Sequence, residues 1–168
     1  MKKNIVIIVL VIISLIGLYS CIDQEKTNNN QKNLNDRQEG KNNKIGENTK
    51  MKIKISNGIY EIIYLLNDSQ ASKTLYAQLP LNVDVENYGD NEKIFYPPKS
   101  LDVNQTPLLE SGGEGTLGYF APWDDVVMYY GSCGSYNGLY VLGEAISGSE
   151  YIKDLSGNLH IEKEGNEL

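Results

Sequence analysis

Residues 51–66, MKIKISNGIYEIIYLL, contain two strand-like runs separated by Asn57-Gly58. In the first run Ile53 and Ile55 alternate with lysines, so the apolar side chains share one face of an extended chain. Asn-Gly between two such runs is a strong hairpin signal, because both residue types accept a positive φ in a tight turn. The segment therefore predicts an antiparallel hairpin with one buried face.

A short helix is predicted directly after this hairpin. Its apolar side chains recur every four residues and so share one face: Ala71, Leu75 and Leu79. Either Asp68 or Ser69 can cap its amino end, and Pro80 prevents its continuation.

The remaining strand candidates are short and are separated by segments rich in Gly, Pro, Ser and Asn. They are residues 81–86, 93–96, 117–121, 126–130, 139–146 and 159–163. Seven or eight short strands with one helix predict a mainly β fold, either a sandwich or a barrel. An antiparallel barrel is favoured, because closure removes the exposed strand edges that promote aggregation.

Four segments of this region carry a resemblance to a known family. In chain order they are 92–98 (EKIFYPP), 118–123 (GYFAPW), Tyr129-Tyr130 and 138–143 (GLYVLG), and Leu79-Pro80 at the end of the helix precedes them. Over residues 51–164 their order and spacing resemble the bacterial cyclophilin-like fold proteins. The resemblance implies a closed antiparallel barrel of about eight strands with one or two short helices, one of which closes an end.

The resemblance does not imply prolyl isomerase activity. Cyclophilins that twist prolyl bonds use an arginine from a Phe-His-Arg stretch, and the one arginine of this chain, Arg37, precedes the predicted domain. A lysine lacks the planar guanidinium fork and is not an equivalent replacement. We therefore expect a non-catalytic binding module, and the alternative is a degenerate peptidyl-prolyl isomerase or another enzyme acting on envelope peptides.

The amino terminus predicts where the protein works. Lys2 and Lys3 precede an apolar run of 14 residues, Ile5–Leu18, which is shorter than the roughly 20 residues of a spanning helix. The run ends in Leu-Tyr-Ser-Cys at Cys21, which is similar to the lipobox of bacterial lipoproteins. We predict a signal peptide at 1–20 and a lipidated Cys21, with an uncleaved signal anchor as the alternative.

Residues 21–50 are rich in Asn and Lys and contain few apolar side chains. Such a segment cannot bury enough surface to offset the entropy of ordering its backbone, so we predict a disordered tether. The cyclophilin-like barrel is assigned to 51–165. This organisation predicts an extracytoplasmic domain, attached to the cell membrane through its lipid anchor.

The charge of the predicted domain limits its partners. Residues 51–168 contain 17 acidic residues, 7 lysines and no arginine, a net charge of −10 with His neutral. Nucleic acid is not an expected partner, because phosphate binding needs clustered basic residues. The expected ligand is a peptide, a protein or a small molecule.

Neither a cofactor nor a metal is expected. The chain has one His and lacks paired cysteines for a zinc site once Cys21 is lipidated. A calcium site among four acidic residues is not expected, because their spacing matches no complete EF-hand loop: Asp84, Glu86, Asp90 and Glu92.

Two catalytic interpretations are weaker than their structural alternatives, so no catalytic residue is assigned. Cys133 with His160 would form a nucleophile and base, but a free thiol in a turn is the favoured interpretation. Four carboxylates would serve acid–base chemistry, but acidic residues between strands are usually turn formers: Glu110, Glu114, Asp124 and Asp125.

The aromatic residues are the candidate ligand-binding residues, since the chain contains 12 Tyr and Tyr and Trp suit recognition surfaces. Strand alternation places Tyr119 and Phe120 on opposite faces, and likewise Tyr129 and Tyr130, so one of each pair belongs to the core. Trp123, after Pro122, is the best candidate for the rim of a groove. The residues selected are Tyr96, Tyr119, Phe120, Trp123 and Tyr130.

Overall fold

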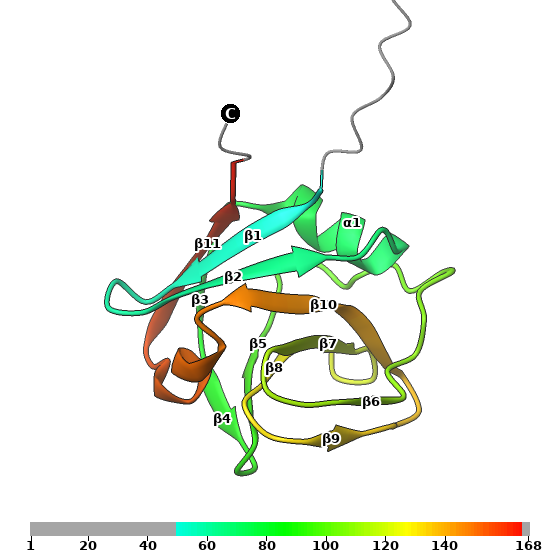
Figure 1. Ribbon diagram of the computed structural model, residues 1–168. Helices are drawn as coiled ribbons and strands as arrows, with labels where there is room; N and C mark the ends of the chain where they lie inside the picture. Colours follow the sequence, from blue (N-terminus) through cyan, green and yellow to red (C-terminus); the bar gives the residue numbers. More distant parts are fainter. Residues whose placement is uncertain (1–49, 166–168) are drawn as a thin grey trace, which may run out of the picture. The chain divides into compact units, whose positions relative to one another are not determined.

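The computed structural model describes residues 50–165 (Figure 1). Its main sheet has nine strands: β1 (Lys52–Ser56), β2 (Glu61–Leu66), β3 (Leu81–Asp84), β4 (Glu86–Tyr88), β5 (Glu92–Phe95), β7 (Thr116–Phe120), β8 (Asp125–Tyr129), β10 (Leu139–Ser147) and β11 (Asn158–Lys163). A second sheet pairs β6 (Ser111–Gly112) with β9 (Cys133–Gly134). The helices of the described region are α1 (Gln70–Gln78) and the 3₁₀-helix η1 (Ser149–Asp154).

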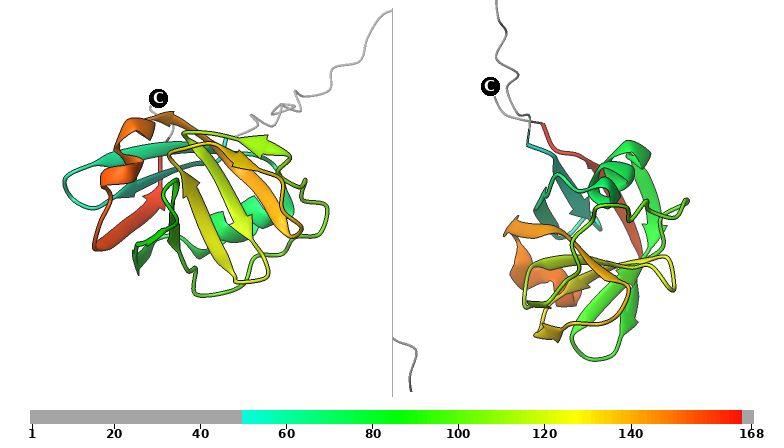
Figure 2. Two further views of the ribbon diagram at one scale, coloured as in Figure 1. Left: turned by 90° about the horizontal axis from the view of Figure 1, so that it is seen from below. Right: turned by 90° about the vertical axis from the view of Figure 1, so that its right-hand side faces the viewer.

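The nine strands form a nearly closed antiparallel barrel. Their order is β3-β11-β1-β2-β10-β7-β8-β5-β4, and Figures 1 and 2 show them curling around a common interior. The two edge strands, β3 and β4, are separated by Val85 alone, whose N–H donates to Gly157 O at 2.9 Å. The prediction of a closed mainly β barrel is confirmed. The count is nine rather than about eight because the single segment 81–88 supplies both edges.

The hairpin predicted at 51–66 is confirmed, but its turn differs from the expected one. β1 ends at Ser56 and β2 begins at Glu61, and in the connecting loop Gly58 has a φ of 84° while Asn57 does not have a positive φ. Asn57 instead accepts hydrogen bonds through its side-chain Oδ1 from the N–H groups of Ile59 and Tyr60, at 3.1 and 2.9 Å. The side chain of Asn57 thus organises a wider loop, and the two-residue turn was the wrong prediction.

The predicted helix is also confirmed, and Ser69 rather than Asp68 is its cap. The Ser69 hydroxyl accepts from the Ser72 N–H at 3.3 Å. Ala71 and Leu75 are buried in the barrel core, as their four-residue spacing predicts. The Ser72 hydroxyl donates to Leu142 O at 2.9 Å, which fixes the helix to β10.

Apolar side chains form two clusters on the two faces of the sheet. The cluster inside the barrel includes Val126 and Met128 of β8, whereas Val127 and Tyr129 of the same strand belong to the second cluster. Because successive side chains of a strand point to opposite faces, the second cluster lies on the outside of the barrel. Leu109 and Cys133, from the segments that carry β6 and β9, pack against it.

The outer face is shaped by a bulge in β10. The register of β10 against β7 shifts between Val141 and Gly143. A Cβ at Gly143 would clash with the backbone of Leu65 and Leu66 on β2, so a side chain here would force the two strands apart.

Three elements were not predicted as strands, namely β4, β6 and β9. β4 has three residues, and β6 and β9 have two each. Such short segments with few apolar side chains show no alternation of apolar and polar residues that would predict a strand. Within residues 50–165, the helices are too short and too polar to cross a bilayer. The predicted signal peptide, Cys21 and the tether up to residue 49 lie outside the described residues.

Candidate functional site

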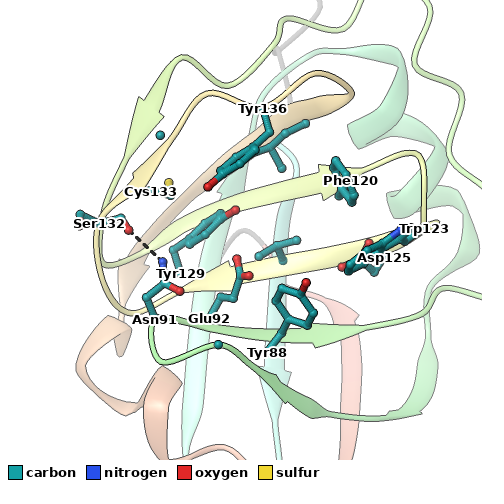
Figure 3. A pocket seen from close by; sticks show the side chains of 14 residues that line it. Tyr88, Asn91, Glu92, Phe120, Trp123, Asp125, Tyr129, Ser132, Cys133 and Tyr136 are labelled. Atoms are coloured by element: carbon teal, nitrogen blue, oxygen red, sulfur yellow. Dashed lines mark hydrogen bonds between the residues drawn. The ribbon is translucent and has the colours of Figure 1, made fainter.

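A pocket with a volume of about 380 Å³ lies on the outer face of the barrel (Figure 3). Its floor comes from β5, β7 and β8, and its walls come from β4, from the turn after β7 and from the segment around β9. Five aromatic side chains line it: Tyr88, Phe120, Trp123, Tyr129 and Tyr136. The size falls within the range of small-molecule sites, which are about 300–1,000 Å³.

Strand register explains how the floor is assembled. Asp125, Val127 and Tyr129 share the outer face of β8 because they alternate with core residues. Asp125 pairs with Phe120 of β7, and Tyr129 pairs with Glu92 of β5. Antiparallel pairing therefore brings these side chains onto one face.

The aromatic wall is centred on Trp123. Its ring centroid lies 5.3 Å from that of Tyr88 and 5.4 Å from that of Phe120, and both contacts are edge-to-face. Trp123 remains 51% exposed, and Tyr136 is 66% exposed. The wall thus has ring faces and edges that stay accessible to a ligand.

Asp125 is the most unusual side chain of the pocket. It is 2% exposed, and its Oδ1 has no hydrogen-bond partner within residues 50–165. Burial raises the pKa of Asp125 to about 6, with smaller contributions from the nearby carboxylates of Glu92 and Asp124. A buried acceptor without a partner costs free energy and calls for an explanation, such as a ligand that supplies the missing donor.

Glu92 places a second carboxyl group in the same pocket. Burial raises its pKa, and a hydrogen bond from the Tyr129 hydroxyl partly offsets this effect. The pKa of Tyr129 is also raised, first by burial and then by the Glu92 charge, so the phenol stays protonated and is the donor. In Figure 3 the side chains of Tyr88, Glu92 and Tyr129 converge on the same space.

The pocket walls are stabilised by a contact between two loops. The Asn91 side-chain amide donates to Ser132 O at 2.9 Å, and the N–H groups of Tyr130 and Gly131 both donate to Asn91 O. These bonds tie the segment after β8 to the start of β5, and so position Cys133 beside the floor.

The thiol of Cys133 lines the pocket but is not paired with His160. Burial raises the pKa of Cys133, and the charges of Glu92 and Glu144 raise it further. His160 lies on β11, where it pairs with strands β1 and β3, and its Nδ1 is 2.9 Å from Asn82 Oδ1. The structure does not assemble this nucleophile and base.

The other carboxylates considered for acid–base chemistry are dispersed. Asp124 accepts a hydrogen bond from the Tyr119 hydroxyl at 2.6 Å, and Glu114 accepts one from Ser149 at 3.0 Å. Only Asp125 lines the pocket among the four. Within the described chain, no group of three or more His, Cys, Asp or Glu side chains is arranged to hold a metal ion.

The structure separates the five selected aromatic residues. Phe120 and Trp123 line the pocket. Tyr119 is 1% exposed in the barrel core and Tyr130 packs against that core, as alternation predicts for one residue of each pair. Tyr96 is exposed just beyond β5 and does not line the pocket, although the charge of Asp125 contributes to raising its pKa.

Several lining residues were not selected from the sequence as ligand-binding residues. Tyr129 was recognisable through its alternation with Tyr130. Glu92 and Asp125 line one pocket only because β5 pairs with β8, and Tyr88 lies on a strand too short to be predicted.

Comparison with known proteins agrees with this architecture. A hypothetical protein from Archaeoglobus fulgidus, solved in solution, is similar to this chain with a TM-score of 0.54 and 15% identity, covering 71% of this chain and 100% of that one. At this identity the likeness shows the fold alone. No curated protein matches the sequence significantly. A model of the cyclophilin-like family matches residues 54–164, and the chain therefore belongs to the cyclophilin-like family.

Proposed function

We propose that this protein is a membrane-tethered, extracytoplasmic binding module that holds its ligand in the pocket on the outer face of the barrel, without turnover. The observation that carries the proposal is the pocket itself, in which five aromatic side chains surround two desolvated carboxyl groups. A concave, largely apolar site with a few convergent polar groups is typical of ligand-binding sites.

The groups that line the pocket favour binding over covalent catalysis. Cys133 has a raised pKa, whereas a nucleophilic cysteine needs a lowered one. Glu92, which lines the same pocket, disfavours a thiolate by like-charge repulsion.

The tether is supported by the sequence before the domain. The lipobox-like Leu-Tyr-Ser-Cys ending at Cys21 and the Asn/Lys-rich segment that follows support attachment through lipid. In Figure 1 the first described residues enter β1 at the opposite end of the domain from β4, β6 and β9. The described chain therefore begins on the side of the domain away from these strands.

A second candidate function, an enzyme acting on envelope peptides, is favoured by one observation. Asp125 has a pKa of about 6, and acid–base catalysts often have pKa values near the working pH. A prolyl isomerisation assay on the same protein tests it. Turnover that is lost in Asp125→Asn would replace the binding proposal with this one.

The binding proposal is tested with the full chain, whose single Trp is Trp123 in the pocket wall. Cell-wall peptides, glycans and small molecules are screened for a saturable change in Trp123 fluorescence. A matched pair of variants locates the binding: Tyr136→Ala removes a pocket wall, while Tyr151→Ala removes an exposed tyrosine that stacks on Tyr60 outside the pocket. Binding that is absent, or equally weakened by both variants, contradicts the proposal.

A further inference from the structure

We propose that the pocket selects a small organic ammonium ion, whose charged nitrogen lies against Asp125, with Glu92 as a second negative charge in the same pocket, while its apolar body lies against the rings of Tyr88, Phe120 and Trp123. This inference rests on the proposed binding function and names the chemical class of its ligand.

Asp125 brings a buried carboxylate to the pocket. Asp125 is 2% exposed, lines the pocket and has an Oδ1 that receives no hydrogen bond within residues 50–165. A carboxylate accepts hydrogen bonds and cannot donate them when it is ionised, so the group that completes it must be a donor. A charged donor forms a stronger bond than a neutral one.

The acidic residues that line the pocket have no basic residue beside them in its lining. Glu92 and Asp125 both line the pocket, and none of its 14 lining residues is Lys, Arg or His. The one buried lysine of β5, Lys93, faces the other side of the sheet, where its ammonium donates to Leu155 O at 2.7 Å. Within the described chain, the ion pairs involve Glu162 and not these carboxylates. A cationic ligand supplies the counter-charge that the lining residues lack.

The rings of Tyr88, Phe120 and Trp123 form an aromatic wall of the pocket. Trp123 contacts Tyr88 and Phe120 edge-to-face, so the three rings present differently oriented surfaces to one space. The face of an aromatic ring attracts a cation through its quadrupole, and Trp is the most effective of the three ring types. Aromatic cages of this kind recognise ammonium groups.

The electrostatics of the carboxyl groups agree with this assignment. Burial raises the pKa of both Glu92 and Asp125, and the charge of Glu92 raises that of Asp125 further, so the pocket disfavours negative charge on Asp125. A bound cation relieves this repulsion. An anionic ligand would increase it, and a neutral ligand would leave it unchanged.

The test uses three probes with the same ring and different charges: cyclohexylmethylammonium, cyclohexylmethanol and cyclohexanecarboxylate. Each is titrated into the full chain at neutral pH while Trp123 fluorescence is followed. We expect the ammonium to bind with a Kd on the order of 1 mM, as suits so small a ligand, the alcohol about tenfold more weakly, and the carboxylate not measurably. A fourth probe, Nα-acetyl-lysine methylamide, tests whether the natural ammonium group belongs to a lysine side chain and not to a free small amine. Binding of either kind of probe supports an ammonium ligand.

Three variants locate the charge effect. Asp125→Asn and Glu92→Gln should each weaken ammonium binding about tenfold and change alcohol binding little. Glu86→Gln is the matched control, because Glu86 is an exposed carboxylate of β4 that does not line the pocket. It should leave both affinities within about twofold, since exposed charges interact weakly through water. Either pocket variant is sufficient if the other does not fold.

The inference is overturned if the alcohol or the carboxylate binds as tightly as the ammonium, or if Glu86→Gln weakens binding as much as the pocket variants do. It is also overturned if the ammonium does not bind although compounds from the screen do, in which case the binding function stands and the ligand class is wrong. If neither binds, the binding function fails as well.

Discussion

Tyr129 lies directly opposite Glu92 in the β5–β8 ladder, and its hydroxyl lowers in part the pKa that burial raises at the Glu92 carboxyl. This contact holds the charged form of Glu92 in an environment where burial favours the neutral form. Burial and the Tyr129 hydroxyl therefore act in opposite directions on the pKa of Glu92.

Tyr129→Phe should raise the pKa of Glu92 further above its ordinary value, because the variant removes the donor and leaves the burial. The measurement is a pH titration of the Glu92 side-chain carboxyl signal by NMR in both proteins. A pKa that stays the same or falls in the variant would show that the hydroxyl does not stabilise the carboxylate.

The contribution of Asp125 to the free energy of unfolding should decrease as the pH rises from 3.8 to about 6. The native pKa of Asp125 is about 6 and its ordinary value is 3.8, so between these values the folded state binds more protons than the unfolded state. This contribution is fully present below pH 3.8, the ordinary pKa, and is lost as the pH rises through the native pKa of about 6. Besides burial, the charges of Glu92 on β5 and of Asp124, the preceding residue, raise the pKa of Asp125.

Urea unfolding of the wild type and of Asp125→Asn across this range isolates the effect, because Glu92 and Glu144 also have raised pKa values and contribute to both proteins. The difference in unfolding free energy between the two should shift in favour of the variant as the pH rises. A constant difference would mean that Asp125 titrates normally in the native state.

Loss of the hydroxyl should change the free energy of unfolding in opposite directions at two buried tyrosines, Tyr64 and Tyr119. Tyr64 is fully buried and its hydroxyl has no partner within residues 50–165, so Tyr64→Phe should increase the free energy of unfolding by about 1 kcal/mol. The Tyr119 hydroxyl accepts from the Leu101 N–H at 3.1 Å and donates to Asp124 at 2.6 Å. Tyr119→Phe should therefore decrease the free energy of unfolding by about 2 kcal/mol. Chemical denaturation measures both, and changes of the same sign would contradict the assignment of partners.

The core of this fold was predictable, because it depends on the local pattern of apolar residues. The pocket was not predictable, because it depends on which strands pair and in which register. Alternation correctly separated Tyr119 from Phe120, and four-residue spacing identified the buried face of α1. Nothing local in the sequence places Asp125 near Glu92, since only the β5–β8 register brings them together. Sequence reasoning treated Asp125 as a turn former, whereas the structure buries it at the first position of β8.

Loss of the Tyr136 ring should weaken ligand binding more than loss of any comparable exposed ring elsewhere. Tyr136 lines the pocket while 66% exposed, so its truncation removes contact area without opening the core. Tyr136→Ala should weaken binding of cyclohexylmethylammonium about tenfold, and Tyr151→Ala should change it less than twofold. Trp123 fluorescence measures both, and circular dichroism confirms that the fold is retained. A larger effect from Tyr151→Ala would place the ligand elsewhere.

The proposed anchor predicts a chemical difference between the two cysteines of the chain, Cys21 and Cys133. Mass spectrometry of the protein isolated from membranes should show an amino terminus at Cys21 that carries lipid, because two or three acyl chains give stable attachment where one does not. Cys21→Ser should abolish both the cleavage and the lipid, whereas Cys133→Ser, the matched control, should change neither. A chain that still begins at Met1 and stays in the membrane after Cys21→Ser would instead establish the uncleaved signal anchor, and the same chain recovered from the soluble fraction would rule out attachment by either route.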